Sequence, residues 1–286
     1  MYEPFEVTTP TGPETPVVVE VPHAATGMPA PYLEPLAAPA RSLARDADLY
    51  VDTLYADAHA EGATMLVAKT SRYAIDVNRA ETDVDAEVVE GARSDVLLHH
   101  GLVWRTTSDG APALTRRLSR QELEERLDRI WRPYHHTLAD LIEDKRRRFG
   151  VCVVLAAHSM PSAERAGGNG NGPSSPRATP TGGRPRADVV PGTRGRRSAA
   201  PRFIEAVESL ASAHAWTLRH DDPYAGGYTT QHYGRPAEGV HVVQVELARR
   251  LYLDETTLRP SANFEAVRRW CRALVAELGR RASQRP

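Results

Sequence analysis

Two stretches of the chain share one pattern, a run of apolar residues that leads to a histidine. Residues 151–157 are all apolar and are followed by His158 and, three positions later, by Pro161. Residues 17–21 are apolar apart from one acid, and His23 follows them after a proline. Such runs predict strands buried on both faces, as in a parallel sheet. We therefore expect both histidines at the carboxyl ends of their strands, where open α/β sheets hold their ligands.

The remaining apolar patterns predict further strands and amphipathic helices. Strands are predicted over residues 64–68, 215–219 and 240–247, and helices over residues 42–62, 121–148, 201–213 and 262–280. Pro133 should kink or restart the second of these helices. The prolines between 27 and 40 and the weak periodicity of residues 80–119 predict loops. The pattern indicates an α/β fold with a largely parallel sheet flanked by helices.

One stretch departs from this alternation. Residues 167–197 are poor in apolar side chains and rich in Gly, Pro, Ser and Arg, which predicts a flexible insertion or a mobile lid. Its arginines alone would suit RNA, but the stretch lacks aromatic side chains on which bases could stack.

Composition narrows the class of protein. The 286 residues are 41% hydrophobic and 26% charged, as in an ordinary globular protein, and the net charge of -1 gives no electrostatic case for nucleic acid or an anionic membrane. The two cysteines, Cys152 and Cys271, are far apart in sequence, so no disulfide framework is expected. We see neither a signal-peptide pattern nor an apolar run of the ~20 residues that span a bilayer. We expect a cytoplasmic protein with a small-molecule substrate; its oligomeric state stays open.

Three acids, Asp46, Asp48 and Asp52, gather near the start of the predicted helix 42–62. Acidic side chains favour a helix N-terminus through the macrodipole, which would explain them without any further role. The alternative is that Asp48 supplies a carboxylate ligand. Either histidine alone is explained by a structural hydrogen bond, but two in matching positions favour a metal site.

The segment 71–79 carries more polar side chains than a surface loop needs, among them Arg72, Asp76, Asn78 and Arg79. An asparagine beside an arginine suits a substrate carboxylate, because the guanidinium binds both oxygens and the amide adds a donor. The alternative is an ion pair of Asp76 with either arginine that only shapes the loop.

Residues 222–234 have the composition of a pocket lining. Adjacent glycines, including Gly227, permit a close backbone approach and stand beside Tyr228 and His232. His135 follows the expected kink in the helix 121–148; it is either packed in the core or a site residue. We treat these side chains as candidates for substrate binding.

Glu246 lies within the apolar strand 240–247, where an unpaired acid is costly. It is either in a salt bridge with Arg79, Arg249 or Arg250, or a general base that faces the site. A mononuclear zinc hydrolase can be built from two histidines, one carboxylate and a free glutamate, and this chain offers all of them. Three protein ligands leave one position on the metal for water, and the glutamate takes a proton from that water.

The chain resembles the N-formylglutamate amidohydrolase family, a branch of the zinc-carboxypeptidase-like hydrolases. The resemblance rests on seven motifs in family order: Val21-Pro-His23-Ala-Ala-Thr-Gly27, Asp48-Leu-Tyr-Val-Asp52-Thr-Leu-Tyr55, Ser71-Arg-Tyr-Ala-Ile-Asp-Val-Asn-Arg79, Pro133-Tyr-His135, Ala157-His-Ser-Met160, Gly226-Gly-Tyr-Thr-Thr-Gln-His-Tyr-Gly234 and Gln244-Val-Glu246. It covers nearly the whole chain and implies a single α/β domain with a mixed central sheet. It also implies hydrolysis of N-formyl-L-glutamate to glutamate and formate in histidine degradation.

Carried over residue by residue, the resemblance implies that His23, Asp48 and His158 hold one divalent metal ion, most simply zinc. It places Asn78 and Arg79 at the substrate carboxylate, and Glu246 as the general base.

Two departures keep other functions open. The family often has an acid where this chain has Ala157, which removes a carboxylate near the expected ligands. The part of the insertion around residues 167–186 is unlike a compact family core. One alternative is a deacylase or carboxypeptidase-like hydrolase acting on another N-acyl amino acid or a peptide. A catalytically silent, ligand-binding member is an alternative of another class.

Overall fold

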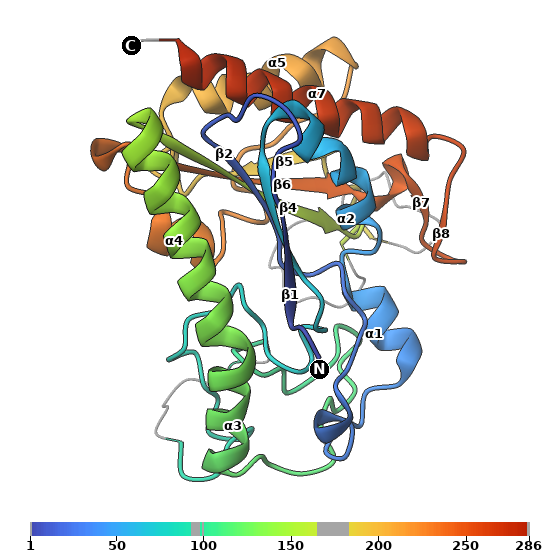
Figure 1. Ribbon diagram of the computed structural model, residues 1–286. Coiled ribbons are helices and arrows are strands. Elements are labelled where there is room, and N and C mark those ends of the chain that lie inside the picture. Colours follow the sequence, from blue (N-terminus) through green and yellow to red (C-terminus); the bar gives the residue numbers. More distant parts are fainter. Residues whose placement is uncertain (1, 93–97, 99, 165–182, 285–286) are drawn as a thin grey trace.

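The computed structural model describes residues 2–92, 98, 100–164 and 183–284 (Figure 1). The strands are β1 (Phe5–Thr8), β2 (Val17–Val21), β3 (Thr64–Ala68), β4 (Cys152–Met160), β5 (Val189–Gly192), β6 (Val240–Ala248), β7 (Leu253–Asp254) and β8 (Arg259–Pro260). The helices are η1 (Ala30–Tyr32), α1 (Ala40–Asp46), α2 (Val51–Leu54), η2 (Ala56–Glu61), α3 (Arg120–Arg126), η3 (Leu127–Trp131), α4 (Arg132–Phe149), α5 (Pro201–Ala213), α6 (Tyr228–Tyr233), η4 (Pro236–Glu238), η5 (Arg249–Leu251) and α7 (Phe264–Ser283).

A six-stranded sheet forms the centre of the molecule, in the order β1-β3-β2-β4-β6-β5. The four inner strands run parallel, and β1 and β5 pair antiparallel at the two edges. Every residue of β2, β3, β4 and β6 is buried, as the continuous apolar runs predict. The predicted α/β fold with a mixed, largely parallel sheet is confirmed.

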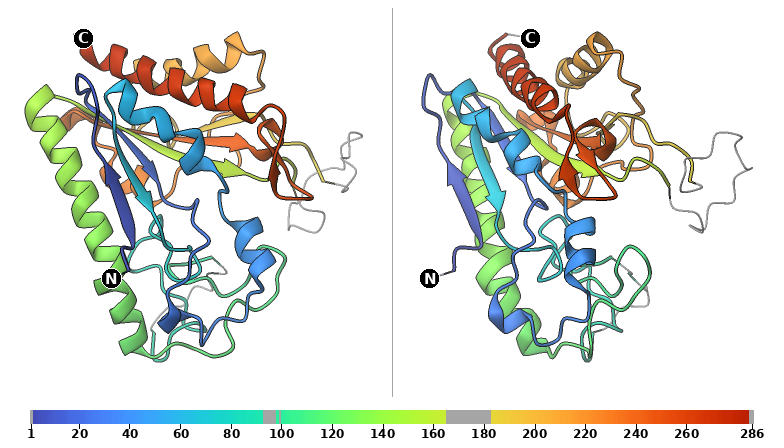
Figure 2. Two further views of the ribbon diagram at one scale, coloured as in Figure 1. Left: turned by 45° about the vertical axis from the view of Figure 1, so that its right-hand side comes forward. Right: turned by 90° about the vertical axis from the view of Figure 1, so that its right-hand side faces the viewer.

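Helices cover both faces of the sheet (Figures 1 and 2). α2, α5 and α7 pack on one face, and α4 and α6 pack on the other. Because side chains alternate along a strand, the odd-numbered residues of β4 and β6 enter the first core and the even-numbered residues face the α4 side. His158, Gln244 and Glu246 therefore share one face of the sheet.

The strand register brings two of these residues together. In the parallel pairing of β4 and β6, His158 lies directly opposite Glu246, and Ala156 lies opposite Gln244. On the other side of β4, Ala156 is paired with Glu20 of β2. The carboxyl ends of β2, β4 and β6 thus deliver polar side chains to one edge of the sheet.

The prediction of one continuous helix over residues 42–62 is wrong. It is broken into α1, α2 and η2, with an extended Ala47 and a left-handed Tyr50 (φ 66°) between the first two. The amide of Asp48 donates to the carbonyl of His23 at 2.9 Å instead of to a helical carbonyl. A tertiary hydrogen bond therefore replaces a helical one where Asp48 turns inward.

The helix 121–148 is present and restarts where Pro133 predicts. α3 begins at a capping box of Ser119 and Glu122, and the π-helical turn η3 lies directly before α4, which holds Pro133 in its first turn. A proline has no amide hydrogen to donate, so the hydrogen-bond ladder shifts at this point.

Other predictions need correction. Of the stretch 167–197, residues 167–182 lie outside the described part of the chain, and Val189–Gly192 forms the buried strand β5 where the sequence predicts an insertion without regular structure. Residues 215–219 do not form a strand: they make one isolated bridge, Leu218 to Val189, after a left-handed Ala215. The segment 222–234 contains the short helix α6. Within the described residues no helix is both long enough and apolar enough to cross a bilayer.

Candidate active site

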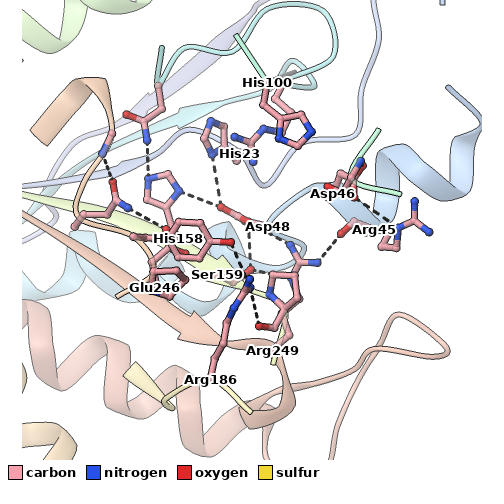
Figure 3. A pocket seen from close by; sticks show the side chains of 18 of the residues that line it. His23, Arg45, Asp46, Asp48, His100, His158, Ser159, Arg186, Glu246 and Arg249 are labelled. Carbon is pink, nitrogen blue, oxygen red and sulfur yellow. Dashed lines mark hydrogen bonds and ion pairs between the residues drawn. The ribbon is translucent and has the colours of Figure 1, made fainter. Parts of the chain in front are cut away.

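A cavity of about 1080 Å³ opens at the carboxyl ends of β2, β4 and β6. His23, Asp48, His158 and Glu246 all line it, although they come from four separate segments (Figure 3). His23, which follows β2, and His158, which lies within β4 near its carboxyl end, meet with their ring centroids 5.0 Å apart. The expectation that both strands deliver a histidine to one place is confirmed.

Asp48 stands between the two imidazoles. Its Oδ2 lies 3.1 Å from Nδ1 of His158 and 3.7 Å from Nδ1 of His23. One ligand atom from each of the three residues lies within 4.8 Å of the other two. Burial opposes ionisation of Asp48, but the hydrogen bonds and charges of the two histidines outweigh it and lower its pKa. The carboxylate is thus kept in the charged form that a cation requires.

The cluster is held from outside by Asp76, which is fully buried. His23 donates from Nε2 to Oδ1 of Asp76 at 2.7 Å. Arg72 and the indole of Trp104 donate to its other oxygen, the shorter Arg72 contact being 2.7 Å and the Trp104 contact 3.1 Å. The Nδ1 atom of His23 remains buried without a hydrogen-bond partner and faces Asp48. A buried nitrogen held in this way is suited to ligate a metal.

Glu246 is buried beside the cluster and makes no salt bridge with the described residues. Arg249 is paired with Asp48 and Arg250 with Asp188, so the ion-pair alternative fails for Glu246. Its Oε1 accepts from Nε2 of Gln244 at 2.9 Å. Burial raises the pKa of Glu246 above its ordinary value, an effect larger than the opposing charge of His158.

Asn78 reaches the cluster because Gly227 has no side chain. A Cβ atom at Gly227 would lie 2.3 Å from the amide nitrogen of Asn78. The Asn78 amide accepts from the backbone of Thr229 at 3.1 Å, and its nitrogen lies 3.3 Å from Nε2 of His158. The amide of Gly227 donates to Gln244 at 2.9 Å. The adjacent glycines therefore serve the close approach that the sequence predicts.

The two arginines of the segment 71–79 differ. Arg72 is bound to Asp76 and stacks over Trp104, with its guanidinium carbon 4.4 Å from the ring centroid, so the structure contains the predicted loop-shaping ion pair. Arg79 donates from Nε to the carbonyl of His100 at 2.9 Å and has no acid partner among the described residues. Both line the cavity, and only Arg79 offers an uncompensated charge there.

Three candidate substrate-binding residues lie outside the lining of the cavity. His135 is buried, with Nδ1 bonded to the Tyr233 hydroxyl at 3.0 Å and Nε2 to the carbonyl of Val77 at 2.8 Å. Both of its nitrogens are thus used within the protein. Tyr228 and His232 stack on each other on α6, with ring centroids 4.9 Å apart. The other candidate residues all line the cavity, whereas His135, Tyr228 and His232 do not.

Two residues support the site although the sequence assigns neither of them a role there: Arg249 and Gln244. Arg249 binds Asp48 and the carbonyls of Arg45 and Ala47, which fixes the break between α1 and α2. This role of Arg249 is visible only in the folded chain, where the end of β6 lies beside the break between α1 and α2. Gln244 has a signal in sequence, since it stands two positions before Glu246 and must share its face of the strand.

Comparisons with known proteins agree with this geometry. A family model described as N-formylglutamate amidohydrolase matches residues 15–253. The N-formylglutamate deformylase of Pseudomonas putida is 32% identical over 84% of this chain and 83% of its own length. The protein of the same name from Pseudomonas aeruginosa is 31% identical over 92% and 91% of the two chains.

A solved structure covers almost the same length. The crystal structure of N-formylglutamate amidohydrolase from Ralstonia eutropha JMP134 superposes with a TM-score of 0.84 at 30% identity, over 97% of each chain. The match to the family model includes every residue that lines the cavity, from His23 to Arg249. The chain therefore belongs to the N-formylglutamate amidohydrolase family.

Proposed function

We propose that this protein is a metal-dependent deformylase that hydrolyses N-formyl-L-glutamate to L-glutamate and formate, as a step of histidine degradation. The observation that carries the proposal is the register of β4 and β6, which sets the buried Glu246 opposite His158 at the edge of a His-Asp-His cluster. The names of the relatives support the substrate.

The cluster fits a divalent metal, and zinc is the ion we propose. Two imidazole nitrogens and one carboxylate oxygen form a usual donor set for catalytic zinc, and Nδ1 of His23 is buried with no partner of its own. His23, Asp48 and His158 would hold the ion. When bound, zinc supplies a Lewis acid that polarises the formyl carbonyl and lowers the pKa of a water molecule.

Glu246 would move the proton during hydrolysis. Water attacks the formyl carbon, Glu246 accepts the proton that the water loses, and it returns this proton to the amine nitrogen as the carbon–nitrogen bond breaks. Burial suits the carboxylate to both directions of transfer, because a pKa raised toward neutrality makes protonation less costly. The hydrogen bond from Gln244 fixes one oxygen and leaves the other for the reactants.

The arginines and Asn78 would orient the substrate. Arg79 has an uncompensated guanidinium beside the cavity, and we assign it to the α-carboxylate together with Asn78. Arg72 is held rigidly by Asp76 and Trp104, which suits it to donate to the carbonyl oxygen as negative charge develops there.

The test is a panel of substrates assayed for amine release with the zinc-loaded protein. The panel contains N-formyl-L-glutamate, N-acetyl-L-glutamate, N-formyl-D-glutamate and the dipeptide Ala-Glu, with His158→Ala as the inactive control. N-formyl-L-glutamate should give the highest kcat/KM. Faster turnover of the acetyl compound or the dipeptide would replace the proposal by the deacylase or peptidase alternative. Turnover of none of them would favour a silent, ligand-binding member.

A further inference from the structure

The arginines that line the cavity differ in whether a carboxylate lies within ion-pair distance of them. Five arginines line it: Arg45, Arg72, Arg79, Arg186 and Arg249. Three of these have a carboxylate partner, namely Asp109 for Arg45, Asp76 for Arg72 and Asp48 for Arg249. Arg79 and Arg186 have none among the residues that the structure describes. Two free guanidinium groups therefore face one cavity.

Arg186 is held beside the segment that follows β4. Its Nη1 donates to the carbonyl of Pro161 at 3.2 Å, three residues beyond His158. The same nitrogen lies 3.3 Å from the hydroxyl of Tyr224, and its backbone amide donates to Ser162 at 3.0 Å. Its Nε is buried without a hydrogen-bond partner. The contacts hold the side chain in one direction but leave its charge uncompensated.

The two free arginines approach from different parts of the chain. Arg79 is bonded to the carbonyl of His100, and Arg186 to the segment after β4. In Figure 3, His100 lies on one side of Asp48 and Arg186 lies on the other. One anion cannot satisfy both groups if they are separated in this way. The arrangement suits a ligand with two anionic groups, one for each guanidinium.

We propose that Arg186 determines specificity by binding the side-chain carboxylate of a dicarboxylic N-acyl amino acid, while Arg79 binds the α-carboxylate. The assignment rests on the proposed function and deepens it. A partly buried guanidinium without a counter-ion is costly to hold, and a carboxylate that replaces water there gains charge-assisted hydrogen bonds. An uncharged side chain of the same shape would leave the charge unpaired, so it is discriminated against.

The experiment compares N-formyl-L-glutamate with N-formyl-L-glutamine, which has the same shape but no side-chain charge. In Arg186→Met, kcat/KM should fall about 100-fold for the glutamate compound and less than about 3-fold for the glutamine compound. Arg186→Lys keeps the charge without the planar fork and should lose about 10-fold on the glutamate compound only. Arg184→Met is the matched control, because Arg184 is exposed and does not line the cavity.

An equal loss on both compounds would overturn the assignment and make Arg186 a structural residue of the segment after β4. Unchanged activity on both would overturn it as well. A second readout does not need catalysis: calorimetric titration should show that Arg186→Met weakens binding of L-glutamate and leaves binding of L-glutamine unchanged. If the wild-type protein hydrolysed no N-formyl amino acid, the proposed function would fail, and the titration would still decide the role of Arg186.

Discussion

His23 donates from Nε2 to Oδ1 of Asp76 at 2.7 Å, and this contact leaves Nδ1 as the nitrogen that faces Asp48. The first prediction concerns the metal that these residues would hold. Elemental analysis of the purified protein should find about one zinc ion per chain, and His158→Ala should lose it. Asp76→Asn should weaken zinc affinity by about 10–100-fold, because an amide has one acceptor oxygen, whereas the carboxylate accepts from His23 through one oxygen and from Arg72 and Trp104 through the other. Asp52→Asn, which changes an acid outside the cavity lining, should retain the ion. Full metal content in His158→Ala would refute the ligand set.

The second prediction concerns Glu246. Glu246→Gln keeps the shape of the side chain and the hydrogen bond from Gln244 but removes the base, so kcat should fall by roughly 10²-fold or more while metal content is unchanged. Glu20→Gln is a matched control, since Glu20 is a fully buried acid on a nearby strand and accepts from Tyr134 and Thr229 through Oε1, as an amide oxygen also would. A similar loss in both variants would mean that any buried acid on this face is needed for folding.

The third prediction concerns Arg79. Arg79→Ala should act mainly on KM, because a carboxylate is bound equally in the ground state and in the transition state. The loss should be large for N-formyl-L-glutamate and small for a simple formamide without a carboxylate. Equal losses on the two substrates would instead make Arg79 a structural partner of His100.

The fourth prediction concerns Gly227. Gly227→Ala would place a methyl group 2.3 Å from the amide nitrogen of Asn78, so the asparagine must move away from His158. We expect at least a tenfold loss of kcat/KM with a melting temperature close to that of the wild type. Gly12→Ala is the control, because a Cβ there meets nothing within 4 Å. Wild-type activity in Gly227→Ala would show that the position of Asn78 does not matter for catalysis.

The fifth prediction concerns pH. Burial lowers the pKa of His135 from 6.5 to about 4, so the folded protein holds this side chain neutral. Below pH 6.5 the unfolded chain binds a proton there that the folded chain does not, and stability falls as the pH decreases toward 4. At pH 4 this residue alone should lower the free energy of unfolding by roughly 3 kcal/mol relative to its value at neutral pH. In urea titrations, His135→Gln should unfold at lower urea than the wild type at pH 7.5 but lose less stability on acidification. Parallel pH profiles would contradict the assignment.

The strands of the fold are largely predictable because their signal is local. An apolar run with a histidine at its end identifies β2 and β4, and the apolar run from Val240 identifies β6. The edge strand β5 is missed because only four residues pair, and they stand inside a stretch rich in glycine and arginine. Their burial depends on β6, which is distant in sequence.

The candidate site is predictable only in part for the same reason. His23, Asp48, His158 and Glu246 come together as the motifs imply. The break in the helix 42–62 is not visible in the sequence, because it depends on a hydrogen bond of Asp48 to the carbonyl of His23 and on Arg249 from the end of β6. His135 differs from the prediction in the opposite direction. It belongs to a motif of the family, but both of its ring nitrogens are bonded inside the protein and it does not line the cavity.

The pairing of His158 with Glu246 across β4 and β6 has a consequence for how this protein could change. Both residues stand on neighbouring central strands, and a shift by one position would turn either side chain to the opposite core. Arg79, Arg186 and Gly227, by contrast, lie outside the strands, on connecting segments or at the start of a short helix. Under the roles proposed above, exchange of those segments would alter which acid is accepted, while His158 and Glu246 stay in place. Laboratory evolution toward new N-acyl substrates should therefore accumulate its substitutions in the segments and leave the two strands untouched.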